Sequence, residues 1–397
     1  MKKIFWILLC FIALLSNCSK EKKNTGQEAI YEFTAQDDSL KMNQIQIIAS
    51  HNSYRIRTDD TILGFLKSLQ SMLPANLNPD DLDYTHENFD VQFSNYQIRG
   101  LEIDIYNDAT GSDFYKRRVN AFVDQQEESG IQDLKTPGAK VLHIKDVDFN
   151  THYYTFKKSL EAIKRWSDAN PRHLPIFVNV ETKLDAPGDE QQLADLGFQK
   201  AAVWDAQSAD ALDQEIRDVF GTNMDKVMTP DKLRGNFATL KAMAESNAWP
   251  TLREARGKIV FILEGSLSSF YAAGHPSLSG RAMFMYASFN SPEAAFLIRN
   301  GSVSQKNDII DKVSKGFIVR TRADSGTTEA RTGNYAPMYA AFESGAQIIS
   351  TDYYKLDPRG GVDPGWTTFK VAFPNGEKGR KNPVNASSVN VDSRLED

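Results

Sequence analysis

From residue 44 onward, short apolar runs rich in β-branched residues alternate with stretches of helical or loop type. Several runs are almost wholly apolar in their first half, as expected of parallel strands that are buried on both faces. They predict eight strands, at Gln44–Ala49, Gly100–Tyr106, Val141–Lys145, Ile176–Thr182, Lys258–Glu264, Phe284–Phe289, Gly316–Arg322 and Gln347–Asp352. Amphipathic spacing between them predicts helices at Tyr154–Asp168, Pro292–Arg299 and Tyr335–Ser344.

Eight strands with helical crossovers indicate an α/β fold, a (β/α)8 TIM-type barrel in regular or distorted form. A doubly wound open sheet is the alternative. Ser53–Arg99 and Leu184–Gly257 are long for simple connections, so we expect insertions with extra helices after strands one and four. The Gly-, Pro- and Asn-rich segment after Tyr354 predicts an irregular tail, and residues 41–397 are expected to form a single catalytic domain.

The first residues have the pattern of an export signal. Met1-Lys2-Lys3 is followed by a 12-residue apolar run, Ile4–Leu15, which is too short to span a bilayer as a stable helix. Residues 1–17 are therefore predicted to be a signal peptide of lipoprotein type, with Cys18 as the lipidated residue and residues 18–40 as a flexible polar tether. Plain secretion is the alternative to a lipid-anchored protein of the cell envelope.

Composition excludes some classes of function. The 397 residues are 41% hydrophobic and 25% charged with a net charge of −6, which argues against disorder and against binding of nucleic acid. The sequence has no Cys/His zinc spacing and no Gly-x-Gly-x-x-Gly motif. We expect a monomer.

Ionisable or amide side chains come at the end of almost every predicted strand. In a barrel the carboxyl ends of the strands meet at one mouth, where the chemistry takes place. We therefore expect these side chains to converge there. The set comprises His51, Asn52, Glu102, Asp104, His143, Asn179, Glu181, Lys183, Glu264, Arg320, Arg322, Asp324 and Asp352.

Three of these carboxylates point to a metal site. Glu102, Asp104 and Glu181 would repel one another in a shared mouth unless a cation were present. With the amide oxygen of Asn52 they form an all-oxygen ligand set, which suits Ca²⁺ or Mg²⁺, and Ca²⁺ tolerates the irregular geometry better. The competing interpretation is that Glu102 or Asp104 only pairs with an arginine across the barrel.

Two histidines are expected beside this cluster, His51 on strand one and His143 on strand three. Such a pair suits phosphoryl transfer, because one can accept the proton of the nucleophile while the other stabilises or protonates an oxygen. The four other histidines fall in predicted connections and are interpreted as structural or surface residues. They are His86, His152, His173 and His275.

These segments together resemble the Ca²⁺-dependent phosphoinositide-specific phospholipases C, in particular their bacterial secreted branch. The resemblance spans about residues 44 to 385, and the common order of many partial motifs is more specific than any one of them. The matching segments are Ser50–Tyr54 (SHNSY), Arg99–Asp104 (RGLEID), Val141–His143 (VLH), Trp166–Ile176 (WSDANPRHLPI), Glu181–Lys183 (ETK), Trp249–Leu252 (WPTL), Arg320–Asp324 (RTRAD) and Ser344–Tyr353 (SGAQIISTDY).

The resemblance implies a (β/α)8-type barrel and a Ca²⁺-dependent phosphodiesterase. His51 would take the proton of the inositol 2-hydroxyl and His143 would stabilise the pentacoordinate phosphorus. The products would be a diacylglycerol and a linear or cyclic inositol phosphate. The implied Ca²⁺ ligands are Asn52, Glu102, Asp104 and Glu181. Lys183, Arg320 and Tyr354 are candidates for holding the inositol ring or its phosphates, although the two cations could equally form simple ion pairs.

Two other functions compete with this one. A glycerophosphodiester phosphodiesterase shares the barrel and a Glu-x-Asp pair, but there Arg-Gly normally follows the first histidine, where this chain has Asn52-Ser53. A surface barrel that binds inositol or a glycan without turnover would not need paired proton carriers. A membrane lipid, a glycolipid anchor and a soluble inositol phosphodiester all remain possible substrates.

Overall fold

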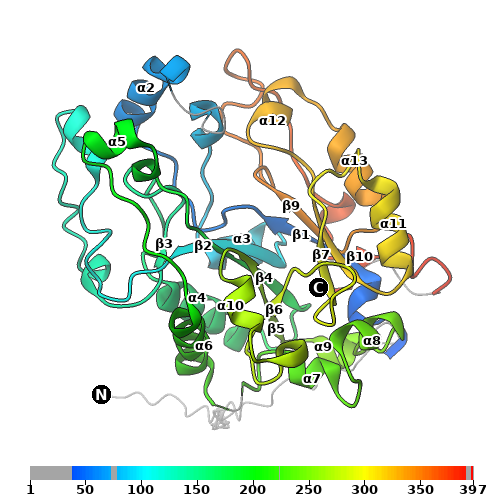
Figure 1. Ribbon diagram of the computed structural model, residues 1–397. Helices are drawn as coiled ribbons and strands as arrows, with labels where there is room; N and C mark the ends of the chain where they lie inside the picture. The colour runs from blue at the N-terminus through cyan, green and yellow to red at the C-terminus, as the bar shows by residue number, and fades with distance from the viewer. Residues whose placement is uncertain (1–37, 73–77, 223, 390–394, 397) are drawn as a thin grey trace, which may run out of the picture. The chain divides into compact units, whose positions relative to one another are not determined.

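The computed structural model describes residues 38–72, 78–222, 224–389 and 395–396, and its central feature is a barrel of parallel strands (Figure 1). Neighbouring strands follow the order β6-β5-β4-β2-β1-β9-β8-β7. A single parallel bridge between Tyr286 and Phe296 joins the two outer strands, so the barrel is nearly closed. Its strands are β1 (Ile45–Ser50), β2 (Gly100–Tyr106), β4 (Ile176–Thr182), β5 (Ile259–Gly265), β6 (Phe284–Met285), β7 (Phe296–Ile298), β8 (Ile318–Arg322) and β9 (Ile348–Thr351).

The predicted TIM-type barrel is therefore confirmed, but one of its eight predicted strands was wrong. Within Val141–Lys145 only the short β3 (Lys140–Val141) is extended, and it pairs antiparallel with the end of β2, outside the barrel wall. The chain turns back after Leu142, because Ile144 and Asp148 form a bridge across a tight loop. His143 consequently lies on a loop and not on a barrel strand.

The eighth strand of the barrel comes from a segment that was predicted to be helical. Within Pro292–Arg299 the residues Phe296–Ile298 form β7, which pairs in parallel with β8. The apolar run is too short for its periodicity to distinguish a buried strand from a helix. The parallel pairing with β8 makes this segment a strand and not a helix.

The helices surround this wall, and both long insertions contain extra helices as predicted (Figure 1). Those after β1 are α2 (Asp60–Ser68) and α3 (Phe89–Asn95). Those between β4 and β5 are α5 (Gln191–Asp195), α6 (Ala206–Phe220), α7 (Pro230–Arg234), α8 (Leu240–Glu245) and α9 (Leu252–Ala255). The remaining helices are α4 (Phe156–Ala169), α10 (Ser268–Ala272), α11 (Lys306–Ser314), α12 (Thr328–Thr332) and α13 (Ala336–Glu343).

Local sequence explains the long helix α4. The Thr155 hydroxyl accepts a hydrogen bond from the Lys158 backbone and caps the first turn. Phe156, Leu160 and Ile163, spaced as one helical face, are fully buried against the main core. The helix is thus held by one cap and one apolar face.

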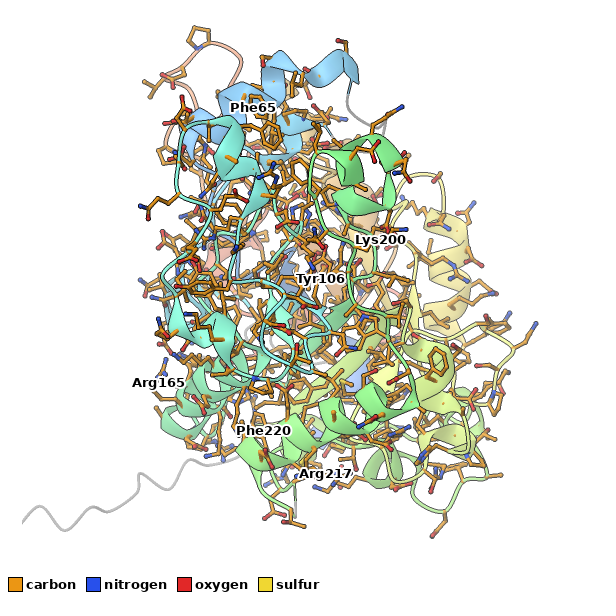
Figure 2. All side chains as sticks on the ribbon, turned by 60° about the vertical axis from the view of Figure 1, so that its left-hand side comes forward. Phe65, Tyr106, Arg165, Lys200, Arg217 and Phe220 are labelled. Carbon is orange, nitrogen blue, oxygen red and sulfur yellow. The ribbon has the colours of Figure 1, made fainter. Side chains whose placement is uncertain are left out.

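A second hydrophobic cluster lies beyond the main core, built from α2 and from loops that follow β2, β3 and β4. The rings of Phe65, Phe122 and Phe198 stack in series, with centroids 6.1 and 5.7 Å apart. Figure 2 shows Phe65 at one end of the molecule, Tyr106 in the interior and Phe220 on α6 at the other end. Val147 and Phe149 belong to this satellite cluster, which therefore anchors the loop that carries His143.

The segment after Tyr354 is largely irregular, as predicted, yet it packs tightly. Phe369, Val371 and Phe373 are buried in the main core, and β10 (Arg380–Lys381) pairs antiparallel with the start of β1. All described residues belong to one compact unit. None of their helices has both the length and the apolar character needed to cross a bilayer.

The predicted signal peptide, residues 1–17, and Cys18 lie outside the described residues. Of the predicted tether, residues 18–40, only the last three are described. Leu40 is fully buried, and its carbonyl oxygen accepts a hydrogen bond from the Leu252 backbone at 2.8 Å. The ordered packing of the barrel domain therefore includes Leu40.

Candidate active site

The turn that follows β1 fixes the first group of site residues. The Ser53 backbone N–H donates to the Glu102 carbonyl at 2.9 Å, and the Ser53 hydroxyl accepts from the Glu102 N–H at 2.8 Å. Asn52 has a φ of +47°, a left-handed conformation that asparagine tolerates better than most residues. Ser53, which had no predicted role, thus attaches the His51–Asn52 segment to β2.

His51 lies between a buried carboxylate and the proposed metal cluster. Its Nδ1 is 2.8 Å from Oδ1 of Asp352, and its Nε2 is 3.7 Å from Oε1 of Glu102. Arg322 donates from Nη1 to Nε2 of His51 at 3.2 Å and from Nη2 to Asp352 at 2.9 Å. Because a guanidinium can only donate, Nε2 must be unprotonated and Nδ1 must carry the hydrogen.

This tautomer leaves His51 neutral and able to accept a proton at Nε2. Burial and the charge of Arg322 lower the pKa of His51 to about 4, although Asp352 acts in the opposite direction. Asp352 itself stays ionised, because the neighbouring His51 and Arg322 outweigh its burial and hold its pKa well below the usual range. His51 therefore has the electrostatic surroundings of a general base.

The three predicted metal-binding carboxylates come together. One oxygen each of Glu102, Asp104 and Glu181 lies within 4.8 Å of the others. Burial raises the pKa of Glu102, and it raises the pKa of Asp104 to about 6. Neighbouring carboxylates add to both effects, as expected of like charges gathered in one place.

Asn52 supplies a further observation on this cluster. Its amide donates from Nδ2 to the Tyr84 hydroxyl at 3.2 Å, which directs Oδ1 toward Asp104. If the amide were rotated, its nitrogen would lie 3.1 and 3.3 Å from the two Asp104 oxygens and would donate to them. In the first orientation the amide oxygen of Asn52 faces the two carboxylate oxygens of Asp104, and a shared cation would stabilise that arrangement. The donors are all oxygens, so the residues present fit Ca²⁺.

Tyr54, the other residue of the SHNSY segment without a predicted role, backs this cluster. Its side chain is fully buried, and the charge of Asp104 adds to burial in raising the pKa of the Tyr54 hydroxyl. Tyr54 is therefore a buried neighbour of one expected ligand.

His143 is held by a separate network on its loop. Its Nδ1 is 2.8 Å from Oδ2 of Asp148, and Arg55 donates from Nε to the same oxygen at 2.7 Å. Thr58 donates its hydroxyl to the other oxygen of Asp148 at 2.5 Å. Arg55 and Asp148 are both fully buried, and together with His143 the guanidinium holds the pKa of Asp148 well below its usual range despite burial.

The predicted substrate-binding cations both lie at the mouth, in ion pairs. Lys183 is 3.1 Å from Glu181 and 3.5 Å from Asp104, and its charge outweighs burial to lower the pKa of Glu181. Arg320 is almost fully buried, pairs with Glu102 and donates to Asn300 at 3.0 Å. The competing interpretation, in which Glu102 pairs with an arginine, is thus also part of the geometry.

The third predicted substrate residue lies elsewhere. Tyr354 is 1% exposed, its ring stacks on His86, and its hydroxyl accepts a hydrogen bond from the Glu87 backbone. His86 lies behind His51, with Nε2 2.7 Å from the His51 carbonyl oxygen, and burial lowers its pKa to about 3, which suits a structural role.

Sequence reasoning missed the partners of both catalytic candidates. Asp352 was recognised as a polar strand end but had no role, and Asp148 and Arg55 had no signal at all, because their loops have no periodic pattern. Glu264 also lies at the mouth, where it accepts a hydrogen bond from Asn179 at 2.7 Å. A groove of about 690 Å³ between α4 and α6 contains none of these side chains, so cavity size does not identify the site.

Comparisons with known proteins identify the family of the chain. Residues 40–383 match the model of the Ca²⁺-dependent phosphoinositide phospholipase C family. Ca²⁺-dependent phosphoinositol-specific phospholipase C from the Gram-negative bacterium Pseudomonas sp. is similar in structure, with a TM-score of 0.52 at 16% identity over 88% of this chain and 97% of that chain. Its myoinositol complex gives 0.50 at 16% identity over 86% and 96%.

A third structure is a Ca²⁺-dependent phosphatidylinositol-specific phospholipase C from Streptomyces antibioticus, with a TM-score of 0.46 at 14% identity over 79% of this chain and 95% of that chain. No curated protein sequence matches the chain. At such identities the Pseudomonas structures support the barrel fold, whereas the family match extends over most of the sequence.

Proposed function

Because the chain belongs to the Ca²⁺-dependent phosphoinositide phospholipase C family, we propose that it cleaves phosphatidylinositol with His51 and His143 as its proton carriers. It is a phosphoric diester hydrolase, and the products would be diacylglycerol and a linear or cyclic inositol phosphate. A single observation carries the assignment of roles: the unprotonated Nε2 of His51 lies 3.7 Å from a carboxylate of the three-acid cluster.

His51 would accept the proton of the inositol 2-hydroxyl at Nε2 as that oxygen attacks phosphorus. The hydrogen on Nδ1 already points at Asp352, so the imidazolium that forms would be stabilised by a carboxylate that is ionised at neutral pH. Arg322 would have to release Nε2 when the substrate enters, and its second bond, to Asp352, would keep the guanidinium close by.

His143 would donate a hydrogen bond from Nε2 to a phosphate oxygen that gains charge in the transition state. Its Nδ1 is occupied by Asp148, and among the described residues no hydrogen bond is formed to Nε2. Asp148 holds the ring at Nδ1, which leaves Nε2 directed away from that pair for the phosphate. Lys183 and Arg320 would orient the headgroup from the opposite side of the mouth.

We propose Asn52, Glu102, Asp104 and Glu181 as the ligands of Ca²⁺. When bound, the ion would neutralise charge on the phosphate and lower the pKa of a coordinated hydroxyl. The oxygen-only donor set supports this choice over zinc.

The test is a substrate panel with and without Ca²⁺. We expect cleavage of phosphatidylinositol that a chelator abolishes and Ca²⁺ restores, and a rate lowered about 10²–10⁴-fold in each of His51→Ala and His143→Ala. Full activity in excess chelator would contradict the metal site. Turnover of glycerophosphocholine in preference to phosphatidylinositol would instead favour a glycerophosphodiester phosphodiesterase, and turnover of neither would favour a binding barrel.

We also propose that the chain is exported and anchored in the cell envelope through a lipid on Cys18, after removal of residues 1–17. The apolar run Ile4–Leu15 followed by Leu15-Ser16-Asn17-Cys18 supports this. Metabolic labelling with a fatty-acid analogue should mark the wild type and leave Cys18→Ser unlabelled. An unlabelled wild type recovered from the medium would favour plain secretion.

A further inference from the structure

Asp324 is a buried acid at the barrel mouth to which the proposed function gives no role. It comes two residues after the end of β8, and its side chain is almost fully buried. The end of β9 lies beside it, since the Ala323 backbone N–H donates to the Ser350 carbonyl oxygen at 2.8 Å. Asp324 is therefore next to the turn that carries Asp352, the carboxylate partner of His51.

The side chain of Asp324 accepts two hydrogen bonds from that turn. Its Oδ1 accepts from the Asp352 backbone N–H at 3.0 Å, and its Oδ2 accepts from the Thr351 hydroxyl. The same hydroxyl accepts from the Tyr353 backbone N–H at 2.8 Å, so one carboxylate holds three consecutive residues. With its backbone fixed in this way, Asp352 presents Oδ1 to Nδ1 of His51 at 2.8 Å.

The backbone of Asp324 holds the other neighbour of His51. Its carbonyl oxygen accepts a hydrogen bond from Nε of Arg322 at 2.9 Å, and its Oδ1 lies 3.8 Å from Nη2 of the same guanidinium. The two Nη atoms of Arg322 donate to Nε2 of His51 and to Asp352. Both nitrogens of the His51 ring therefore contact a residue that Asp324 holds in place.

A buried acid can also serve the stability of the fold alone, and Asp213 on α6 is an example. Its carboxylate accepts from the Ala282 backbone N–H at 3.2 Å and from the Tyr271 hydroxyl. These partners lie on α10 and on the segment before β6, away from His51. Asp324 forms the same two kinds of bond, but both of them end on the turn that carries Asp352.

We propose that Asp324 is a positioning residue for the proposed reaction. It fixes Asp352 and Arg322 on the two sides of the His51 imidazole, and so sets the direction from which Nε2 accepts the proton of the attacking hydroxyl. It acts through these two side chains and not through contact with the substrate. The inference rests on the proposed function for the role of His51, whereas the effect of Asp324 on the His51–Asp352 pair can be measured without turnover.

The first measurement is proton NMR of the hydrogen on Nδ1 of His51, because a histidine N–H that is donated to a buried carboxylate resonates far downfield. The Nδ1–H of His143, which is 2.8 Å from Asp148, gives a second such signal and serves as an internal reference. The loss of one signal in each of His51→Ala and His143→Ala assigns them. Asp324→Ala should shift or lose the His51 signal and keep the His143 signal.

The second measurement is the rate of phosphatidylinositol cleavage with Ca²⁺. Asp324→Ala should lower kcat about 10²-fold with little change in KM, because a misdirected proton acceptor slows the chemical step and leaves substrate binding intact. Asp324→Asn keeps an acceptor for the Asp352 N–H, and its amide can donate to the Thr351 hydroxyl, so it should recover most of kcat and the His51 signal. In an Asp352→Ala background, Asp324→Ala should have almost no further effect on kcat, because the acid that it positions is gone.

Asp213→Ala is the matched control, because it removes one bond from a backbone N–H and one from a hydroxyl outside the mouth. Each variant is assayed where circular dichroism shows it to be folded. Asp213→Ala should lose stability in urea as Asp324→Ala does, but keep both signals and the wild-type kcat. An unchanged His51 signal in Asp324→Ala, or an equal loss of kcat in Asp213→Ala, would overturn this inference and leave the proposed function standing. A wild type that cleaves no lipid, but whose His51 signal is lost in Asp324→Ala, would overturn the proposed function and support the positioning of the His51–Asp352 pair by Asp324.

Discussion

Asp148, the buried acid that contacts His143, is expected to support both the stability and the activity of the protein. Asp148→Asn keeps the size of the side chain and removes its charge. The variant leaves Arg55 fully buried without its counter-ion, since Asp148 is the only acid within 4.0 Å of that guanidinium among the described residues. It also places an amide where one oxygen now accepts from both Arg55 and His143.

The magnitude follows from this burial. Removing one partner of a fully buried ion pair costs about 3–5 kcal/mol, because the other charge remains out of water. Three further bonds of Arg55, to the Tyr84 and Leu82 carbonyls and to Thr58, keep the guanidinium in place and prevent its escape to solvent. Since a domain of this kind is stable by about 5–15 kcal/mol, the variant should fold but lose a large fraction of its stability.

Urea unfolding measures the loss of stability in Asp148→Asn, and the rate of phosphatidylinositol cleavage measures the loss of activity. Asp148→Asn should also lower kcat by about 10²–10⁴-fold, because His143 loses the acceptor that orients its ring. In a His143→Ala background the same change should have almost no further effect on kcat, since both act through one imidazole. Asp60→Asn, which breaks an exposed pair with Arg57, is the control for stability. Wild-type stability in Asp148→Asn, or additive losses of kcat, would refute the reasoning.

Three further predictions test other parts of the molecule. Ca²⁺ at 100 times its Kd should stabilise the protein against thermal unfolding by about 2.7 kcal/mol. Glu181→Gln should lose most of that stabilisation. The same stabilisation in the variant and the wild type would contradict Glu181 as a ligand. Burial lowers the pKa of His173 to about 4, so the stability it contributes is present above about pH 6.5 and is lost on acidification, by about 2 kcal/mol between pH 6.5 and 5. Urea unfolding of His173→Gln should show that much less pH dependence, and an unchanged slope would be inconsistent with a neutral buried His173. Gly316→Ala should destabilise the protein strongly, because φ is +94° and a Cβ would lie 2.2 Å from the Ala244 carbonyl oxygen. Gly64→Ala in α2 should instead stabilise the protein by up to about 1 kcal/mol, because a Cβ there meets open space.

The parts of the fold that the sequence predicted are those with a strong local signal. The apolar residues of β2 and β4 recur at alternate positions, and both strands have the predicted bounds. The three-residue β7 carries too short a pattern, and only its pairing with β8 makes it a strand. His143 was assigned to a strand for the opposite reason: the apolar Val141-Leu142 before it resembles a strand, while the tight loop that follows depends on tertiary contacts.

The same contrast between local sequence signals and tertiary contacts explains why only part of the candidate site could be predicted from the sequence. Residues at strand ends, such as Asn52, Glu102 and Glu181, could be grouped from the sequence, because parallel strands bring their carboxyl ends to one mouth. Buried partners such as Arg55 could not, because a charged residue in a loop is usually exposed and nothing in its neighbourhood indicates burial.

The two candidate histidines are also positioned by different parts of the molecule, and this has a consequence for stability and function. His51 and Asp352 follow Ser50 and Thr351, which pair directly in the β1–β9 register, so closure of the barrel holds that dyad together. His143 and Asp148 lie on one loop anchored in the satellite cluster by Val147 and Phe149. Local opening of that cluster would displace His143 while His51 and the acid cluster stay in place, because loops with few core contacts open at lower free energy than barrel strands. Truncating Phe122 in the ring stack should therefore lower kcat at temperatures well below global unfolding, and leave Ca²⁺ binding intact.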